Sequence, residues 1–364
     1  MKKVFFLVNS LEMGGAERVI SEISPFLKEK FDVEILTLKS GKFYDVGVKQ
    51  TSLLNTNSNL AMLFFFPYYV WKLRKIWKQN PDCKIVSFLE WSNFVNILAV
   101  KNAAISLRIA LSFFKGLKGA FYKILISWLY PKAGTIIVNS EENKFDLAGR
   151  LNIDPARIRV ICNPQDFAKI AKLKAEPVEP DFLELIKGKK VFVSVGRLDE
   201  QKRYDILINA FRKLAEKDVK NILIIIGDGP LKEELEQLIE RLNLQENVFL
   251  IGRRSNVFKY LNKANYFVYS SRAEGFPNVL LEAMSVDVPI ITSDFKTGGR
   301  ELIAPGLEFY KEIDYPYYGP NGVLLSLADF DLSKVKLEKV NQNQEGIKRF
   351  DIGNVVKKWI ELLE

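Results

Sequence analysis

Two glutamates frame the apolar stretch "EGFPNVLLE" at residues 274–282. Proline is favoured at the first position of a helix, so we expect a helix to begin near Pro277. Glu274 then lies in the loop before this helix and Glu282 on its second turn. A helix start presents free N–H groups and the positive end of its dipole, which suits a phosphate. The pair therefore indicates a ligand site, and the alternative is a solvated pair on a surface helix.

Two cations follow another predicted strand, in "SVGRLDEQKRYDILINAF" at residues 194–211. The strand is expected to end at Gly196, and Arg197 and Lys202 follow in a short polar loop. Ligands of α/β proteins bind at the carboxyl ends of parallel strands. A guanidinium fork and an ammonium point charge together suit a diphosphate. The alternative is two solvated surface cations.

Glycine turns follow two further predicted strands. Gly14 and Gly15 stand in "VNSLEMGGAERVI" (8–20), where the missing side chains let a backbone approach a ligand closely. The pattern G-x-G-x-x-G is absent, so a plain tight turn is the alternative. The stretch "IIIGDGPLKEELEQL" (224–238) is interpreted as scaffolding, with a place beside a nucleotide base as the alternative.

The composition excludes several kinds of chemistry. The chain has no histidine, which removes the commonest general base and any histidine-based triad or zinc site. Cys83 and Cys162 lack metal-ligand spacing and indicate a reducing compartment. The D-x-D pattern at 329–331 lies in a predicted loop and is interpreted as chance. We therefore expect neither a metal nor a cofactor.

Short apolar runs alternate with helix-like segments along all 364 residues, which exceeds the usual size of one core. This alternation predicts an α/β fold of two Rossmann-like, doubly wound parallel-sheet domains. We expect an N-terminal domain at 1–167, a nucleotide-binding domain at 168–345 and a C-terminal helix at 346–364 that crosses back to the first domain. The proline-containing stretch 163–182 is interpreted as the linker. The predicted strands are 3–8, 33–38, 84–88, 135–138, 158–162, 190–195, 221–226, 247–251, 266–269 and 289–292.

The net charge of +9 is concentrated in one window. Residues 51–135 contain eleven basic side chains but only two acidic ones, Asp82 and Glu90, so this window carries the whole surplus. Aromatic residues alternate with the charges, which indicates an anionic partner. The basic residues are Lys72, Arg74, Lys75, Lys78, Lys84, Lys101, Arg108, Lys115, Lys118, Lys123 and Lys132.

The segment 112–130 has the pattern of a helix with an apolar face about 160° wide, and 64–78 repeats its aromatic and basic character. Lys115 and Lys123 lie outside the apolar arc and Lys118 lies at its edge. Such helices suit the headgroup region of an anionic membrane. The alternative is packing against the domain's own sheet. The arc consists of Phe113, Phe114, Leu117, Phe121, Ile124, Leu125, Trp128 and Leu129.

No apolar run reaches the roughly 18 residues of a membrane span, and the first apolar run is too short for a signal peptide. We therefore expect a cytoplasmic protein that associates peripherally with the inner face of the cell membrane.

Five segments together resemble the retaining GT-B glycosyltransferases of family four. They occur in family order over nearly the whole chain, and the resemblance is strongest to bacterial enzymes that extend polyprenyl-diphosphate-linked glycans. The resemblance implies GT-B architecture, with the two domains facing a central cleft. The segments are "GGAER", "SVGRLDEQK", "GDGPLKEELEQL", "EGFPNVLLEAM" and "TGGREL".

The resemblance also implies roles for individual residues. Arg197 and Lys202 would hold the donor diphosphate, Glu274 would contact the donor sugar and Glu282 the ribose. The donor would be a UDP-hexose or UDP-N-acetylhexosamine, transferred with retention to a lipid-linked or other surface glycan without a metal. The implied donor site comprises Gly14, Gly15, Arg197, Lys202, Gly275, Phe276, Asn278, Val279 and Glu282, with backbone N–H groups from Phe276 to Val279. From the basic and aromatic pattern described above, the expected membrane and acceptor residues are Arg108, Lys115, Lys118 and Lys123.

One departure and three alternatives qualify the resemblance. Many relatives carry a histidine in the segment that corresponds to 106–114, where this chain offers Arg108 and Ser112. A sugar-nucleotide epimerase of the same fold relies more on histidine, which weighs against it. Binding of nucleic acid would give Glu274 and Glu282 no role, and the sequence has no recognised nucleic-acid-binding motif. We therefore expect no nucleic acid as a partner. A non-catalytic partner subunit would not need Arg197 and Lys202.

Overall fold

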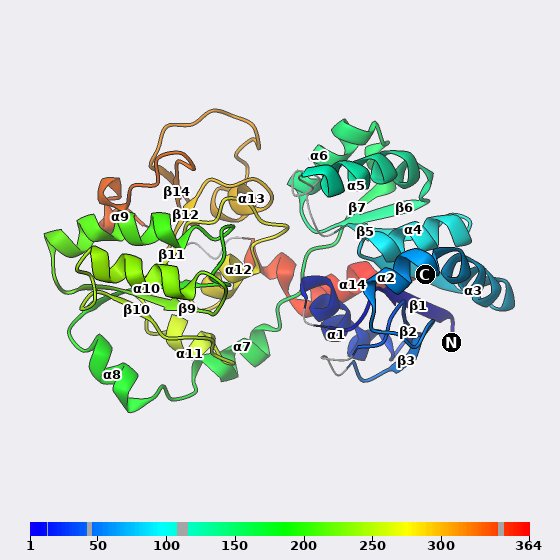
Figure 1. The fold of residues 1–364 in the computed structure, drawn as a ribbon, viewed down its shortest axis with the longest axis horizontal. Helices are drawn as coiled ribbons and strands as arrows, with labels where there is room; N and C mark the ends of the chain where they lie inside the picture. Colours follow the sequence, from blue (N-terminus) through cyan, green and yellow to red (C-terminus); the bar gives the residue numbers. More distant parts are fainter. Residues whose placement is uncertain (13, 42–45, 108–115, 341–345) are drawn as a thin grey trace. The chain divides into compact units, whose positions relative to one another are not determined.

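The computed structural model describes residues 1–12, 14–41, 46–107, 116–340 and 346–364. They form two compact units (Figure 1). The first unit comprises residues 1–165 together with 349–364, and the second comprises 166–348. Each is an α/β unit built on its own sheet.

The first unit is built on a seven-stranded parallel sheet with the order β3-β2-β1-β4-β5-β6-β7. Its strands are β1 (Lys3–Val8), β2 (Asp32–Thr37), β3 (Lys49–Ser52), β4 (Lys84–Phe88), β5 (Ala104–Leu107), β6 (Thr135–Val138) and β7 (Ile158–Val160). Its helices are α1 (Gly15–Leu27), α2 (Asn59–Phe64), α3 (Phe66–Gln79), α4 (Glu90–Ala99), α5 (Gly116–Leu129), α6 (Glu141–Leu151) and α14 (Ile352–Leu363).

Helices cover both faces of this sheet, because alternate residues of a strand point to opposite sides. In β1, Phe6 packs with helices α1 and α14, whereas Phe5 and Leu7 pack with α3 and α4. Both faces are therefore apolar, as a buried parallel sheet requires.

Helix α14 completes the core of the first unit, although it comes from the end of the chain. Its Trp359 is fully buried, and its ring lies 5.9 Å from that of Phe6 and 5.8 Å from that of Phe88. The backbone of Gln165 is hydrogen-bonded to Phe350 and Ile352, which joins the two parts of the unit. The red helix α14 lies beside the dark-blue helix α1 in Figure 1.

The second unit contains a seven-stranded sheet with the order β10-β9-β8-β11-β12-β14-β13, in which only β13 is antiparallel. Its strands are β8 (Lys190–Val195), β9 (Asn221–Ile226), β10 (Val248–Leu250), β11 (Tyr266–Tyr269), β12 (Ile290–Ser293), β13 (Tyr317–Gly319) and β14 (Gly322–Leu325). Its helices are α7 (Phe167–Lys174), α8 (Pro180–Ile186), α9 (Tyr204–Lys217), α10 (Lys232–Arg241), α11 (Phe258–Leu261), α12 (Asn278–Met284) and α13 (Gly299–Ile303).

The structure contains elements that the sequence patterns did not predict. β3, β5, β13 and β14 are additional strands, and the predicted linker at 163–182 holds α7 and the start of α8. These helices pack within the second unit, where the Asn256 side chain donates to the carbonyl of Leu173. In the described part of the chain, no helix is long and apolar enough to cross a membrane.

We expect Trp359→Ala to lower the free energy of unfolding by about 3–5 kcal/mol, because it removes a large buried side chain and leaves a cavity. Urea denaturation followed by circular dichroism measures this loss. The matched control is Trp71→Ala, since Trp71 is 58% exposed and its removal should change stability by about 0.5 kcal/mol or less. Equal effects of the two variants would contradict the role assigned to α14.

Candidate functional site

Three predicted residues of the second unit lie in loops at the point where its strand order reverses. Strands β8 and β11 are neighbours, while β9 follows β8 on the other side. The loop after β8 carries Arg197 and Lys202, and the loop after β11 carries Glu274. Ligands of open α/β sheets bind outside the carboxyl ends of the strands at this reversal.

Lys202 and Glu274 form a largely buried ion pair. The Lys202 Nζ lies 2.7 Å from the Glu274 Oε1, and the two side chains are 15% and 9% exposed. The same oxygen accepts hydrogen bonds from the hydroxyls of Tyr269, at 2.6 Å, and Ser271, at 2.5 Å. The other carboxylate oxygen accepts only a long bond of 3.3 Å from the Gln201 amide among the described residues. Glu274 is thus fixed in place and keeps one oxygen with spare acceptor capacity.

The Tyr269 hydroxyl connects the two charged groups. It donates to Glu274 and accepts from the Lys202 ammonium at 2.5 Å. Burial, followed by the nearby Glu274 charge, raises the pKa of Tyr269 well above its usual value. The phenol therefore stays protonated and remains a donor to the carboxylate at every ordinary pH.

Two residues in the loops around the ion pair have strained backbone conformations. Arg203, directly after Lys202, has φ 54°, and Thr297 has φ 75°. Such conformations cost about 1–3 kcal/mol each and persist only where surrounding contacts enforce them. Here the Thr297 hydroxyl is bonded to the Glu274 carbonyl, and the Ser270 hydroxyl donates to the carbonyls of Lys202 and Arg203.

Arg197 lies on the same loop but outside the ion pair. Its side chain is 73% exposed, and its Nε donates to the Asp199 carboxylate at 2.8 Å. The structure therefore brings Lys202 and Glu274 together and leaves Arg197 at the solvent side of the loop.

The "GDG" glycines have a packing role. A Cβ atom on Gly227 would lie 1.8 Å from the carbonyl oxygen of Gly196, and one on Gly229 would lie 2.4 Å from that of Leu198. Only glycine permits the loops after β8 and β9 to approach so closely. This agrees with the scaffolding interpretation of the segment.

Helix α12 begins at Asn278 with Pro277 as its N-cap, close to the predicted start. Glu274 and Glu282 are both only 7% exposed, so they are not a solvated surface pair. Phe276 is equally buried, and its carbonyl accepts the Asn278 N–H at 3.0 Å. That N–H, predicted to meet a phosphate, is therefore already bonded in this structure. Gly275 and Val279 flank these residues in the same segment.

The remaining predicted residues belong to the first unit. Gly14 is the N-cap of α1, and a Cβ atom there would lie 2.3 Å from a Glu17 carboxylate oxygen, while Gly15 faces open space. Lys123 is exposed on α5. Lys118 lies on the same helix, with its side chain outside the described part. Arg108, Ser112 and Lys115 lie outside the described residues.

The D-x-D pattern has a structural explanation. Asp329 forms an ion pair with Lys334, and the Asp331 carboxylate lies 2.8 Å from the Lys213 ammonium. Both aspartates thus have ion-pair partners in the segment after β14 or on α9.

Several residues of this site were missed in the sequence. Gln201, Tyr269, Ser271 and Thr297 contact Glu274, yet they come from three separate segments. Only the pairing of β8 with β11 brings the first two together, so spacing along the chain carried no signal for them.

Comparison with known proteins identifies the family. Residues 177–326 match the model described as "Glycosyl transferases group 1", and residues 13–169 match "Glycosyltransferase Family 4". An uncharacterized glycosyltransferase of Methanocaldococcus jannaschii is 35% identical over 68% of this chain and 68% of its own. The chain belongs to glycosyltransferase family 4.

Two further likenesses cover the whole molecule. A Campylobacter jejuni protein, N-acetylgalactosamine-N,N'-diacetylbacillosaminyl-diphospho-undecaprenol 4-alpha-N-acetylgalactosaminyltransferase, is 31% identical over 99% of this chain and 100% of its own. The crystal structure of Anabaena HepE in complex with UDP superposes with a TM-score of 0.72 at 18% identity, over 99% of each chain. This family 4 glycosyltransferase thus has the GT-B fold, as predicted.

We expect Tyr269→Phe to slow turnover of the sugar donor about tenfold, because Glu274 and Lys202 lose the hydroxyl that connects them; tenfold corresponds to about 1.4 kcal/mol. Release of nucleoside diphosphate measures the rate. Tyr266→Phe on the same strand is the control, since the Tyr266 hydroxyl bonds the Leu337 carbonyl away from the site. Equal rates for the two variants would show that the Tyr269 hydroxyl does not position the pair.

Proposed function

We propose that this enzyme transfers a hexose or N-acetylhexosamine from a UDP-sugar, with retention, to a polyprenyl-diphosphate-linked glycan at the cytoplasmic face of the membrane. The observation that carries the proposal is the buried Lys202–Glu274 pair at the carboxyl edge of the second sheet. The Lys202 ammonium suits the diphosphate of a nucleotide sugar, and the adjacent Glu274 carboxylate suits the hydroxyls of its sugar. The pair thus supports a donor site for a nucleotide sugar.

The chemistry follows from the charge that must be stabilised. Departure of the nucleoside diphosphate develops negative charge on its phosphate oxygens, which Lys202 and Arg197 would neutralise. The freer Oε2 of Glu274 would accept a donor-sugar hydroxyl and fix the anomeric carbon. The acceptor hydroxyl would attack from the face that the diphosphate leaves, and a phosphate oxygen would take its proton. Retention follows from this geometry, and no metal is required.

Relatives support the acceptor class. The Campylobacter protein named above acts on a diphospho-undecaprenol-linked sugar, and an Escherichia coli relative, 25% identical, is a UDP-Gal:alpha-D-GlcNAc-diphosphoundecaprenol galactosyltransferase. UDP is the nucleotide in the Anabaena complex. We extend these substrate classes to the present enzyme as part of the proposal.

The first unit carries an unusual exposed surface that fits a lipid-linked acceptor. Helix α5 buries Ile126 and Leu129 in the core but exposes Phe121, Ile124 and Trp128 by 50–68%. Packing in the core therefore accounts for only part of the predicted apolar face of α5. We call these three residues, with the exposed side chains of α2 and α3, the aromatic–basic surface. The α2–α3 members are Leu60, Leu63, Phe64, Phe65, Trp71, Arg74, Lys75 and Lys78.

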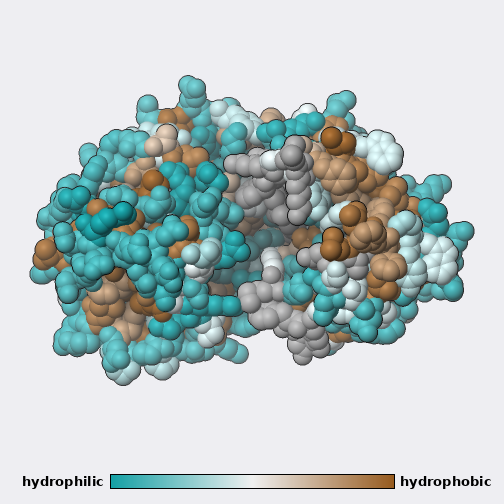
Figure 2. Space-filling view, in the orientation of Figure 1, coloured by the Kyte–Doolittle hydropathy of each residue, from teal (hydrophilic) through white to brown (hydrophobic). Residues whose placement is uncertain are grey.

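Contacts within the unit connect the two parts of this surface. Trp91 lies between Phe66 of α3 and Tyr122 of α5, with ring centroids 5.8 and 6.2 Å away. Figure 2 shows brown, hydrophobic side chains gathered over the first unit. The Lys132 ammonium lies 3.6 Å from the Trp128 ring, so charge and aromatic surface are combined. Large aromatics beside lysines suit the headgroup region of an anionic bilayer.

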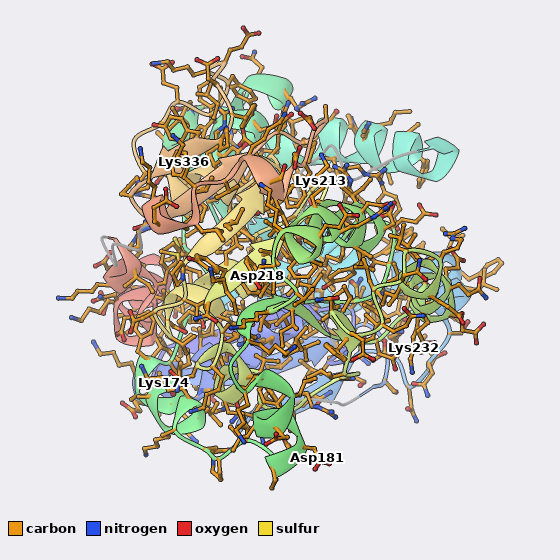
Figure 3. All side chains as sticks on the ribbon, turned by 90° about the vertical axis from the view of Figure 1, so that its left-hand side faces the viewer. Lys174, Asp181, Lys213, Asp218, Lys232 and Lys336 are labelled. Carbon is orange, nitrogen blue, oxygen red and sulfur yellow. The ribbon has the colours of Figure 1, made fainter. Side chains whose placement is uncertain are left out.

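The second unit provides a contrast. Figure 3 looks at this unit and labels charged side chains of both signs, including Lys213 and Asp218. Mixed charge of this kind is typical of a surface that faces water.

We expect radiolabelled sugar to pass from a UDP-sugar to an undecaprenyl-diphosphate-linked acetamido-sugar, in the presence of EDTA. Lys202→Ala should reduce this transfer by about a hundredfold or more, because a cation that stabilises the leaving group is worth about 3 kcal/mol. Chromatography of the lipid product measures transfer, and NMR of its anomeric proton reports retention. Thermal stabilisation by UDP but not by other nucleoside diphosphates tests the donor separately. A fully active Lys202→Ala variant would overturn the site assignment.

We expect the double variant Ile124→Ser, Trp128→Ser to bind anionic phosphatidylglycerol vesicles about tenfold more weakly, because both side chains would enter the interface. Vesicle sedimentation measures binding. The control is Leu183→Ser, Val219→Ser, which removes two exposed apolar side chains from the second unit. If both double variants bind like the unaltered protein, α5 is not a membrane contact.

A further inference from the structure

The two sheets of this enzyme share a strand order that relates two of their glutamates. Each contains five parallel strands in the order third, second, first, fourth, fifth, counted along its own unit. Strand β4 of the first unit therefore corresponds to β11 of the second. Glu274 lies in the loop after β11, and Glu90 lies two residues after β4. Glu90 thus stands at the strand reversal of the first sheet, where α/β sheets bind ligands.

Backbone strain marks the same two places. Apart from Asn, Asp and Gly, the described residues with positive φ are Leu89, Arg203 and Thr297. Arg203 and Thr297 hold the loops of Lys202 and Glu274. Leu89, with φ 71° and ψ 153°, directly precedes Glu90. Strain of this kind is rare for a bulky side chain and concentrates at functional sites.

A buried polar network fixes the helix that carries Glu90. The Asn93 amide accepts from Ser87 at 2.8 Å and donates to the Ser106 carbonyl at 3.1 Å and the Tyr130 hydroxyl at 2.9 Å. Networks in which every member is bonded hold their elements rigidly. The start of α4, where Glu90 lies, is therefore held rigidly.

Among the residues that the structure describes, the Glu90 carboxylate forms no ion pair and no hydrogen bond with another side chain. These contacts therefore give it no structural role. Its neighbours include the half-buried rings of Trp91 and Tyr122, which meet edge to face with centroids 6.2 Å apart. Glu90 is half-buried, and this burial raises the pKa of its carboxyl group above the usual value. A carboxylate beside aromatic rings suits a sugar, because hydroxyls can donate to its oxygens and the apolar face of the sugar can pack on the rings.

We propose that Glu90 binds a hydroxyl of the acceptor sugar, in a subsite bordered by Trp91 and Tyr122. The acceptor, rather than the donor, is the occupant because the same Trp91 connects α3 and α5, the helices of the aromatic–basic surface. A lipid-linked glycan held on that surface would place its sugar next to these rings. The inference rests on the proposed function and adds the residue that recognises the acceptor.

Glu90→Gln tests this subsite, because it keeps the side-chain shape and removes the charge. With undecaprenyl-diphosphate-linked acetamido-sugar as the probe, we expect the acceptor KM to rise about tenfold, whereas the donor KM and the hydrolysis of UDP-sugar in the absence of acceptor stay within twofold. Glu141→Gln is the matched control, since Glu141 is an exposed first-turn glutamate of α6 on the same unit. It should behave like the unaltered enzyme.

The outcomes separate this inference from the function on which it rests. Transfer by the unaltered enzyme with an unchanged acceptor KM in Glu90→Gln would overturn the acceptor subsite alone. An equal rise in the donor KM, or a fall in donor hydrolysis, would overturn it as well by assigning Glu90 to the donor. Absence of transfer by the unaltered enzyme, despite stabilisation by UDP, would overturn the proposed acceptor class and this inference with it.

Discussion

The buried pair of Lys202 and Glu274 is the constraint around which the second unit is organised. Removing two charges from water costs several kcal/mol for each ion, and the cost is recovered only if the pair is well oriented and its remaining groups are hydrogen-bonded. Tyr269, Ser271 and Gln201 supply those bonds. In the proposed reaction, the donor diphosphate would replace Glu274 as the partner of Lys202, and sugar hydroxyls would replace Lys202 as a partner of Glu274. Binding would therefore require little additional desolvation of the two side chains.

Much of the fold could be predicted from sequence because buried parallel strands are continuous apolar runs. β8 and β9 are clear cases, and their predicted bounds agree with the structure. β3, with the sequence KQTS, could not be recognised, since it is a polar strand at the edge of its sheet. β13, with only three residues, is too short for any periodicity to appear. Such strands are defined by their neighbours rather than by their own residues.

The site was predictable to the extent that its residues lie in one segment. Glu274 and Glu282 frame a proline that begins a helix, and this pattern is visible in the chain. The Tyr269 hydroxyl, by contrast, matters because the loop after β8 brings Lys202, 67 residues away along the chain, to it. Likewise, α5 is apolar around most of its circumference, and the sequence could not tell which apolar residues the core would leave exposed. The chemistry of each residue follows from its type, whereas the strand order decides which distant residues come close together.

The return of α14 to the first unit has a consequence for how the protein is made. The second unit is, in effect, inserted into the first, so all of its residues are synthesised before residues 349–364. The first unit lacks Trp359 until that segment has been added. Domains generally fold as units while the chain emerges. Until then the α1 residues that pack with α14 lack that partner, so the core of the first unit is completed only after the second unit has been synthesised.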